Sequence, residues 1–249
     1  MAIIQVAGLA TNYETVGAGP ALVLLHGWAN AWEAWLPIIP FLSDHYTLLI
    51  PDLPGCGRTD TPKEGWSTPQ HAKWLQDFLQ ATGQTVVGAV GHSYGGKILL
   101  EYCSGPYSHQ PKKLALIDSS GIPNILNSKQ KTLRLAARFT PKTIKDKITS
   151  TFRGKLYASF GADSDYVWAN EFQKKTLQLI LKEDYTQKLS SIAQPTLLLW
   201  GKSDTSTPLW QGETMHNLIP LNQLKTYDAG HFPHHTYPKP VSDELCHFL

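Results

Sequence analysis

One serine in the sequence is placed for nucleophilic chemistry. The segment GHSYG at 91–95 carries Ser93 directly after a short apolar run and directly before a segment with helical character. A tight turn from strand to helix lifts its central side chain clear of the sheet, and flanking glycines make room for the strained backbone. A serine hydroxyl is a poor nucleophile at neutral pH until a base removes its proton. The chemistry of Ser93 therefore depends on partners elsewhere in the chain.

The base is expected to be a histidine that follows another strand. His231 comes shortly after the strand-like segment QLKTY at 223–227. His234 and His235 lie in the same loop and are the alternatives, but they are further from the end of the strand. We therefore predict that His231 is the base that activates Ser93.

A carboxylate must hold such a histidine in one tautomer and stabilise its protonated form. Asp204 ends the segment LLLWGKSD at 197–204, just past a predicted strand, and is our predicted acid. Asp118 also follows a predicted strand and is the main alternative, although a structural or loop-capping role is expected for it. Asp228 is too close to His231 in the chain to orient its ring easily.

Acyl transfer also requires N–H donors for the oxygen that becomes negative, and each donor lowers the barrier by about 3 kcal/mol. The segment HGW at 26–28 follows the first buried strand. The backbone amides of Trp28 and Tyr94 are the predicted pair of donors. His26 is expected to hold this loop through hydrogen bonds rather than to act as a second base.

Five apolar runs predict the strands that position these residues. Short runs that are apolar on both faces and bounded by glycine or proline are typical of a buried parallel sheet. They lie at 20–28, 46–55, 85–96, 112–121 and 194–204. Helical patterns lie between or after them, at 68–82, 97–102 and 240–249. Strands that alternate with helices predict an α/β fold with a doubly wound, mostly parallel sheet.

The domain organisation follows from length and from one interruption of this alternation. A chain of 249 residues is expected to form a single domain, 1–249. Residues 3–15 alternate loosely and predict an antiparallel hairpin at the sheet edge. Residues 122–193 contain amphipathic helical patterns without a convincing buried strand. We predict an inserted helical cap there; the alternative is that these helices extend the outer helical layer.

The substrate pocket is expected between the carboxyl edge of the sheet and the cap. Trp28, Tyr94, Ile122 and Phe232 are the predicted wall residues, together with aromatic residues of the cap. Such an apolar wall suits acyl or aryl groups better than charged metabolites.

Composition excludes several classes of function. Lys and Arg number 22 and Asp and Glu number 20, so the net charge is only +2. Nucleic acid binding would call for a clustered basic patch, so no nucleic acid partner is expected. The longest apolar runs, such as 21–25, are far too short to cross a bilayer.

The start of the chain and its cysteines predict a cytoplasmic protein. Residues 1–13 lack the basic and long apolar regions of a signal peptide. Cys56, Cys103 and Cys246 are odd in number and form no CxxC pair, so we expect free thiols rather than disulfides or a zinc site. No phosphate loop, metal-ligand spacing or dinucleotide fingerprint occurs, so no cofactor and no metal are expected.

Together these segments resemble the α/β-hydrolase superfamily over nearly the whole chain. The matching segments are HGW at 26–28, DLPGCGRTD at 52–60, GHSYGG at 91–96, PTLLLWGKSDTSTP at 195–208 and AGHF at 229–232. The resemblance implies that Ser93 is the nucleophile, Asp204 the acid and His231 the base. It also implies that the amides of Trp28 and Tyr94 bind the oxyanion.

The HGW segment at 26–28 resembles that of small carboxylesterases such as the pimeloyl-ester carboxylesterase of biotin synthesis. This finer resemblance implies a serine esterase that cleaves small-molecule carboxylic esters through an acyl-enzyme intermediate, as a monomer or weak dimer. Haloalkane dehalogenases and epoxide hydrolases of the superfamily carry Asp at the nucleophile position, so Ser93 argues against both. C–C bond hydrolases and perhydrolases share the triad and stay open. A non-catalytic ligand-binding relative on the same fold is the remaining alternative.

Overall fold

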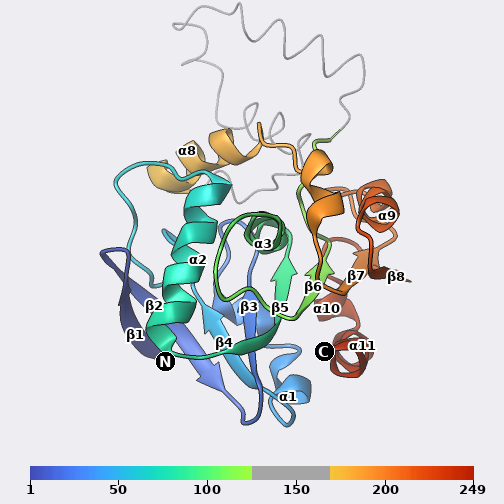
Figure 1. Cartoon of the computed structure of the whole chain (residues 1–249), viewed down its shortest axis with the longest axis horizontal. Coiled ribbons are helices and arrows are strands. Elements are labelled where there is room, and N and C mark those ends of the chain that lie inside the picture. Colours follow the sequence, from blue (N-terminus) through green and yellow to red (C-terminus); the bar gives the residue numbers. More distant parts are fainter. Residues whose placement is uncertain (125–168) are drawn as a thin grey trace, which may run out of the picture.

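The computed structural model describes residues 1–124 and 169–249, which build one eight-stranded sheet between layers of helices (Figure 1). The strands are β1 Ala2–Val6, β2 Leu9–Val16, β3 Ala21–Leu25, β4 Thr47–Pro51, β5 Val86–His92, β6 Lys113–Ile117, β7 Thr196–Gly201 and β8 Asn222–Tyr227. The helices are α1 Ile39–Leu42, α2 Thr68–Thr82, α3 Tyr94–Ser104, α8 Glu171–Ile180, α9 Leu209–Leu218, α10 Pro233–Thr236 and α11 Pro238–Phe248, with 3-10 turns η1 Trp32–Trp35 and η2 Thr186–Ser191.

The strand order is β1-β2-β4-β3-β5-β6-β7-β8. β1 pairs with β2 and β2 pairs with β4 in antiparallel fashion, whereas every pairing from β4 to β8 is parallel. The predicted α/β fold with a mostly parallel sheet is therefore confirmed. The predicted hairpin at 3–15 corresponds to β1 and β2, and the predicted helix at 68–82 is α2.

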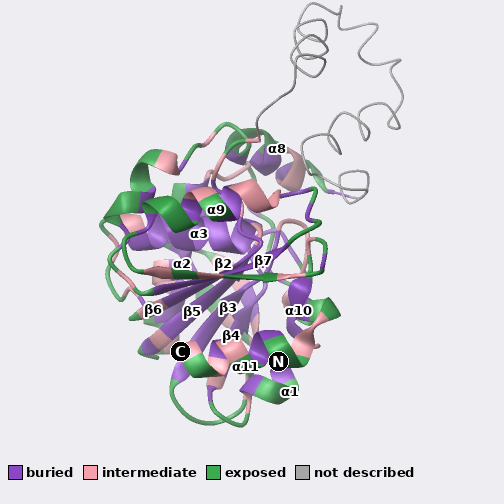
Figure 2. Ribbon diagram, turned by 90° about the vertical axis from the view of Figure 1, so that its right-hand side faces the viewer, coloured by how far each residue is buried: buried purple, intermediate pink, exposed green. Residues whose placement is uncertain are grey.

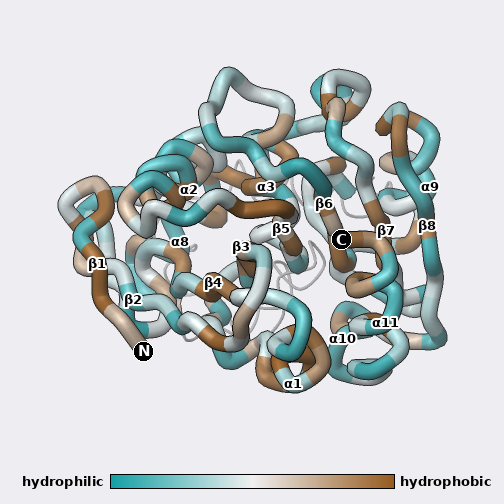
Figure 3. Tube along the Cα trace, turned by 60° about the horizontal axis from the view of Figure 1, so that its bottom comes forward, coloured by the Kyte–Doolittle hydropathy of each residue, from teal (hydrophilic) through white to brown (hydrophobic). Residues whose placement is uncertain are grey.

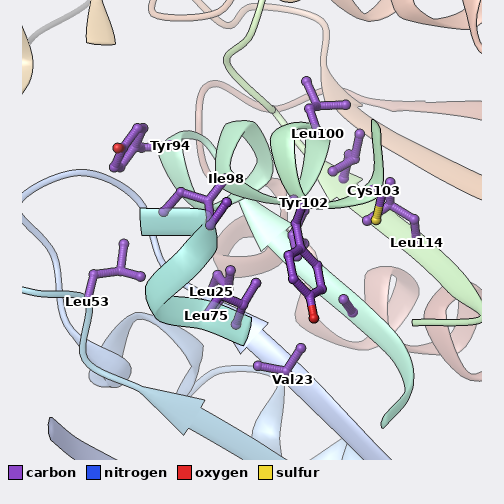
Figure 4. Packing of buried hydrophobic residues seen from close by; sticks show 14 of the residues in the cluster. Val23, Leu25, Leu53, Leu75, Tyr94, Ile98, Leu100, Tyr102, Cys103 and Leu114 are labelled. Atoms are coloured by element: carbon purple, nitrogen blue, oxygen red, sulfur yellow. The ribbon is translucent and has the colours of Figure 1, made fainter. Parts of the chain in front are cut away.

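The central strands bury both faces because helices cover the sheet from both sides (Figure 2). Val23 and Leu25 of β3 belong to a core shared with α2 and α3 (Figure 4). Leu22 and Leu24 of the same strand point the other way, into a core shared with α1 and α11. This explains the unbroken apolar runs in the sequence, which Figure 3 shows as hydrophobic stretches of chain in β4 and β5.

Helix α8 lies above the layer that contains α2 and α3 (Figure 2). Lys97 of α3 is buried and donates to the carbonyls of Ile180 and, at 3.2 Å, Glu183. The carboxylate of Glu183 lies 3.6 Å from Lys97 and accepts from the amide of Thr68 at 3.0 Å, so it joins the start of α2 to α3. Burial lowers the pKa of Lys97 to about 8, and the charge of Glu183 offsets part of that shift.

Most of the predicted cap at 122–193 lies outside the described residues, which resume at 169. The described parts of it, 122–124 and 169–193, contain α8 and η2 and no strand. The thiols of Cys56, Cys103 and Cys246 are free. Among the described helices, none has both the length and the apolar character needed to cross a membrane.

Candidate active site

Five residues singled out from the sequence follow five parallel strands. Trp28, Ser93, Asp118, Asp204 and His231 come after β3, β5, β6, β7 and β8, respectively. Because these strands run parallel, all five residues lie at the carboxyl edge of the sheet, where ligands bind in open α/β folds.

Ser93 occupies a strained turn between β5 and α3. Its φ is +50° and its ψ is −114°, a conformation that residues with a side chain rarely adopt. A Cβ atom on Gly95 would lie 2.1 Å from the carbonyl oxygen of Leu25, and one on Gly91 would lie 2.6 Å from the amide nitrogen of Gly96. The flanking glycines are thus required by close backbone approaches, as expected for a turn of this kind.

Backbone hydrogen bonds fix this turn to the neighbouring strand β6. The amide of Ser93 donates to the carbonyl of Ile117 at 3.0 Å, and the carbonyl of Ser93 accepts from the amide of Ser120 at 3.0 Å. The side chain of Ser93 is half-buried and so stays accessible at the edge of the sheet. The conformational strain is held by the surrounding fold, which keeps the hydroxyl at one place.

His231 and Asp204 form the hydrogen-bonded pair that the sequence predicts. Nδ1 of His231 lies 2.7 Å from Oδ2 of Asp204. The side chain of Asp204 is fully buried, whereas that of His231 is 14% exposed. Because the carboxylate of Asp204 accepts a hydrogen bond from Nδ1, the proton of the neutral imidazole of His231 lies on Nδ1. Nε2 is then the nitrogen that can accept a proton.

Hydrogen bonds from the loop after β7 stabilise the charge of Asp204. Its Oδ1 accepts from the amides of Ser206 at 2.7 Å and Thr207 at 3.1 Å, and its Oδ2 also accepts from the hydroxyl of Thr207 at 2.7 Å. Burial opposes the charge, but the hydrogen bonds from His231 and Thr207 outweigh it and lower the pKa of Asp204. Thr207 was not singled out from the sequence, although it lies in the matching segment 195–208.

A second histidine links the loop of His231 to the turn of Ser93. His92 immediately precedes Ser93, and its Nε2 donates to the carbonyl of His231 at 2.8 Å. Burial lowers the pKa of His92 well below the ordinary value, and the neighbouring histidines lower it further. The ring is therefore neutral and acts as a hydrogen-bond donor that holds the loop in place. This role of His92 could not be read from the sequence.

The two alternative histidines are placed elsewhere. His234 is fully buried and packs against the ring of Trp35, with ring centroids 5.1 Å apart. Nε2 of His235 donates to the carbonyl of Ala34 at 2.8 Å. Among the histidines of the loop after β8, His231 is the one that meets a carboxylate.

The amides of Trp28 and Tyr94 remain available for an oxyanion. Neither amide donates to an acceptor among residues 1–124 and 169–249. Tyr94 begins α3, and the first amides of a helix have no partner within the helix. The helix dipole adds partial positive charge at the same place.

His26 and Asp52 hold the loop that contains Trp28. His26 donates from Nδ1 to the carbonyl of Gly27 at 2.7 Å and accepts at Nε2 from the amide of Leu53 at 3.0 Å, as the predicted loop-holding role requires. Asp52 is fully buried and its Oδ1 accepts from the amide of Trp32 at 2.8 Å. Asp52 opens the matching segment at 52–60, but its contact with the loop could not be read from that motif.

Asp118, the alternative acid, lies beside the same pair. Its Oδ1 accepts from the amide of Gly201 at 2.8 Å, and it has no hydrogen bond to His231. Burial raises the pKa of Asp118 to about 9, and the charge of Asp204 contributes to the shift. Both effects favour the protonated, neutral form of the Asp118 carboxyl.

One cluster in the described residues brings three potential metal ligands together. A carboxyl oxygen of Asp118 and ring nitrogens of His92 and His231 lie within 4.8 Å of one another. Nδ1 of His231 is already bonded to Asp204, and Nε2 of His92 is bonded to a carbonyl. These hydrogen bonds fit a catalytic base and the groups that support it. We therefore assign no metal to the cluster.

A small, mostly apolar cavity lies on the side of Trp28 and Tyr94 that faces α2 and α8. Its lining consists of Trp28, Leu53, Pro54, Cys56, His71, Tyr94, Phe172, Gln173 and Thr176. Two of the predicted wall residues, Trp28 and Tyr94, are among them. Ile122 and Phe232 are not; Phe232 is 37% exposed and packs against the ring of His92.

The model of a family described as the alpha/beta hydrolase family matches residues 22–244. The chain is 22% identical to the esterase of Exiguobacterium antarcticum, whose solved structure superposes with a TM-score of 0.81 over 99% of this chain and 98% of that one.

Two curated relatives cover most of the chain and differ in chemistry. The chain is 25% identical to the 2-hydroxy-6-oxo-2,4-heptadienoate hydrolase of Pseudomonas putida, over 92% of its own length and 89% of the relative. It is 23% identical to the pimeloyl-[acyl-carrier protein] methyl ester esterase of Vibrio vulnificus, over 95% of its own length and 97% of the relative.

Proposed function

Because the chain belongs to the alpha/beta hydrolase family, we propose that it is a serine hydrolase that cleaves carboxylic esters. The observation that carries the proposal is the pair of His231 and Asp204, with 2.7 Å between Nδ1 and Oδ2. The loop of this pair is hydrogen-bonded through His92 to the turn that presents Ser93. Base, acid and nucleophile thus come from three strands but are held by one network.

In the proposed mechanism the hydroxyl of Ser93 attacks the carbonyl carbon of the ester. Nε2 of His231 accepts the hydroxyl proton as the new C–O bond forms, and Asp204 stabilises the resulting imidazolium. The amides of Trp28 and Tyr94 donate to the oxyanion of the tetrahedral intermediate. The intermediate collapses, the C–O bond to the alcohol breaks, and His231 returns its proton to the leaving alcohol.

The second half of the reaction releases the acid. The acyl group is now bound to the oxygen of Ser93. His231 takes a proton from a water molecule, the resulting hydroxide attacks the acyl carbon, and the same two amides stabilise the second oxyanion. The carboxylic acid leaves and Ser93 recovers its proton. No cofactor takes part in these steps.

The cavity favours an acyl group with apolar character. Most of its wall comes from carbon atoms of residues such as Trp28, Leu53 and Phe172. The ring of His71 also faces it, and burial lowers the pKa of His71 to about 4, so this wall carries no charge at neutral pH. Uncharged acyl or aryl esters therefore fit better than charged substrates.

Cleavage of a C–C bond is the second candidate reaction. The similarity to the 2-hydroxy-6-oxo-2,4-heptadienoate hydrolase over 92% of this chain favours it. The groups needed to activate Ser93 and to bind an oxyanion would be the same in both reactions. Only turnover measurements on the two kinds of substrate separate them.

The test measures turnover of p-nitrophenyl esters with acyl chains from acetate upwards and of aryl esters. A vinylogous diketone acid serves as the substrate for C–C bond cleavage. Ester turnover that exceeds C–C cleavage by at least tenfold in kcat/KM is the expected result. Turnover of the diketone acid alone would assign the C–C reaction. No turnover of any substrate, together with no labelling of Ser93 by a fluorophosphonate, would assign a non-catalytic relative.

A further inference from the structure

The carboxyl group of Asp118 is buried beside the candidate base, and only one of its two oxygens has a hydrogen-bond partner among the described residues. Asp118 follows β6 with a positive φ of +41° and has no exposed surface. Its Oδ1 accepts from the amide of Gly201 at 2.8 Å. Its Oδ2 is buried and has no hydrogen-bond donor among the described residues. A buried carboxylate oxygen without a donor is costly, whereas a protonated oxygen can itself donate.

The groups that face this carboxyl come from every neighbouring strand end. His92 from β5 and His231 after β8 have ring nitrogens within 4.8 Å of a carboxyl oxygen of Asp118. Asp204 after β7 acts on Asp118 through its negative charge, which adds to the effect of burial and raises the pKa of Asp118. The hydroxyl of Thr207 lies 3.0 Å from the carbonyl of Asp118 and 2.7 Å from Oδ2 of Asp204.

Hydrogen bonds decide which of the two carboxyl groups keeps the proton. Asp204 accepts from the amides of Ser206 and Thr207, from the hydroxyl of Thr207 and from Nδ1 of His231. Asp118 accepts only from the amide of Gly201. Two carboxylates that share a buried site do not both ionise readily. The negative charge therefore stays on Asp204 and the proton on Asp118.

We propose that Asp118 is a positioning residue: a neutral carboxylic acid whose proton is donated to the carboxylate of Asp204 and holds it against Nδ1 of His231. This rests on the proposed function of the pair of Asp204 and His231. The neutral state matters because a second negative charge would favour the protonated imidazole, which cannot accept the proton of Ser93. An unprotonated Asp118 would also repel Asp204 from its position.

Two substitutions of Asp118 distinguish a role as hydrogen-bond donor from a role in packing alone. Asp118→Asn keeps an oxygen for Gly201 and provides an N–H in place of the acid proton, whereas Asp118→Ala removes both. We expect kcat of Asp118→Ala to fall about tenfold or more, because the charged carboxylate of Asp204 loses a buried hydrogen bond. We expect Asp118→Asn to recover most of that loss with KM unchanged. An Asn variant as impaired as the Ala variant would overturn the proposal.

The pH dependence of activity gives a second readout. With the pKa of Asp118 raised to about 9, the wild type should lose kcat/KM as pH rises through about 9, because Asp118 then becomes an anion. Asp118→Asn has no proton to lose and should lack this alkaline decline. Identical profiles for the wild type and the Asn variant would contradict a protonated Asp118.

Thermal unfolding without substrate tests the proton independently of any reaction. The folded pKa of Asp118 is raised from 3.8 to about 9, so its protonated carboxyl contributes stability fully below pH 3.8 and loses it progressively as pH rises to about 9. The Tm of Asp118→Asn minus that of the wild type should therefore increase across this window. Asp228→Asn is the control, because the side chain of Asp228 is 77% exposed and should give a flat difference.

These readouts distinguish failure of the inference from failure of the proposed function. A pH-independent Tm difference for Asp118→Asn would overturn the protonated Asp118 even in an active esterase. A widening difference in a protein that cleaves no ester would support the proton on Asp118 and reject the proposed hydrolase function instead.

Discussion

Nδ1 of His231 lies 2.7 Å from Oδ2 of Asp204, although the two residues are 27 positions apart in the chain. The contact follows from the sheet, because β7 and β8 pair in parallel with Gly201 opposite Tyr227. The two loops that leave these strands therefore start side by side at the carboxyl edge. A base and its acid partner are brought together by strand register rather than by local sequence.

Substitution of Asp204 tests the acid assignment. Asp204→Asn removes the charge that stabilises the imidazolium and can hold His231 in the wrong tautomer. We expect kcat on p-nitrophenyl acetate to fall by about 10³- to 10⁴-fold with little change in KM. Asp118→Asn is the comparison, and a larger loss there than in Asp204→Asn would show that the acid has been assigned to the wrong strand.

Thr207→Val tests how the charge of Asp204 is supported. Valine keeps the shape but loses the hydroxyl that lies 2.7 Å from Oδ2 of Asp204. The lowered pKa of Asp204 gives stability that is present above its unfolded value and is lost as pH falls through the folded value. Without the hydroxyl, acid unfolding should begin at a higher pH, and the free energy of unfolding at pH 7 should drop by about 1 kcal/mol.

Thr205→Val provides the matched control for Thr207→Val. Thr205 lies in the same loop but is exposed. We expect its acid unfolding midpoint, followed by circular dichroism, to match the wild type. Equal midpoints for Thr207→Val and the wild type would mean that the hydroxyl does not stabilise the carboxylate.

His92→Phe tests the link between the base and the nucleophile. Phenylalanine keeps an aromatic ring beside Phe232, whose centroid is 4.9 Å from that of His92, but cannot donate to the carbonyl of His231. We expect kcat to fall about tenfold while Tm changes by only a few degrees, because packing is retained and one buried hydrogen bond is lost. Unchanged kcat with a large drop in Tm would indicate a purely structural histidine.

Gly95→Ala tests the close approach that shapes the turn of Ser93. A Cβ there would lie 2.1 Å from the carbonyl oxygen of Leu25, which cannot move without disturbing β3. We expect a loss of about 3 kcal/mol or more in the free energy of unfolding, at the upper end for overpacking. Gly230→Ala is the control, since no atom lies within 4 Å of its Cβ position, and its urea unfolding curve should match the wild type.

Much of the sheet could be predicted because its central strands have a recognisable apolar pattern in the sequence. β3 and β7 are buried on both faces, so their runs are apolar throughout. The predicted helix at 68–82 matches α2, which follows the N-cap residue Ser67 and is capped at its end by Gly83 in the left-handed conformation. These are local signals of capping and burial, and they do not depend on distant parts of the chain.

The supporting residues of the site could not be predicted, because they depend on contacts between loops. The hydroxyl of Thr207 donates a hydrogen bond to the carboxylate of Asp204, and His92 donates one to the carbonyl of His231 in another loop. The neutral state of Asp118 depends on how many donors each carboxyl meets, which only three-dimensional placement reveals. The predicted helices within 125–168 lie outside the described residues and stay predictions.

The most direct measurement is the mass of the protein after reaction with a fluorophosphonate, compared between the wild type and Ser93→Ala. We predict that the wild type gains one phosphonyl group, mapped by peptide sequencing to Ser93, and loses all ester turnover. Ser93→Ala should gain none and should have no turnover before or after the reaction. Ester turnover by Ser93→Ala at the wild-type rate, or labelling of the wild type at another residue, would contradict a nucleophilic Ser93.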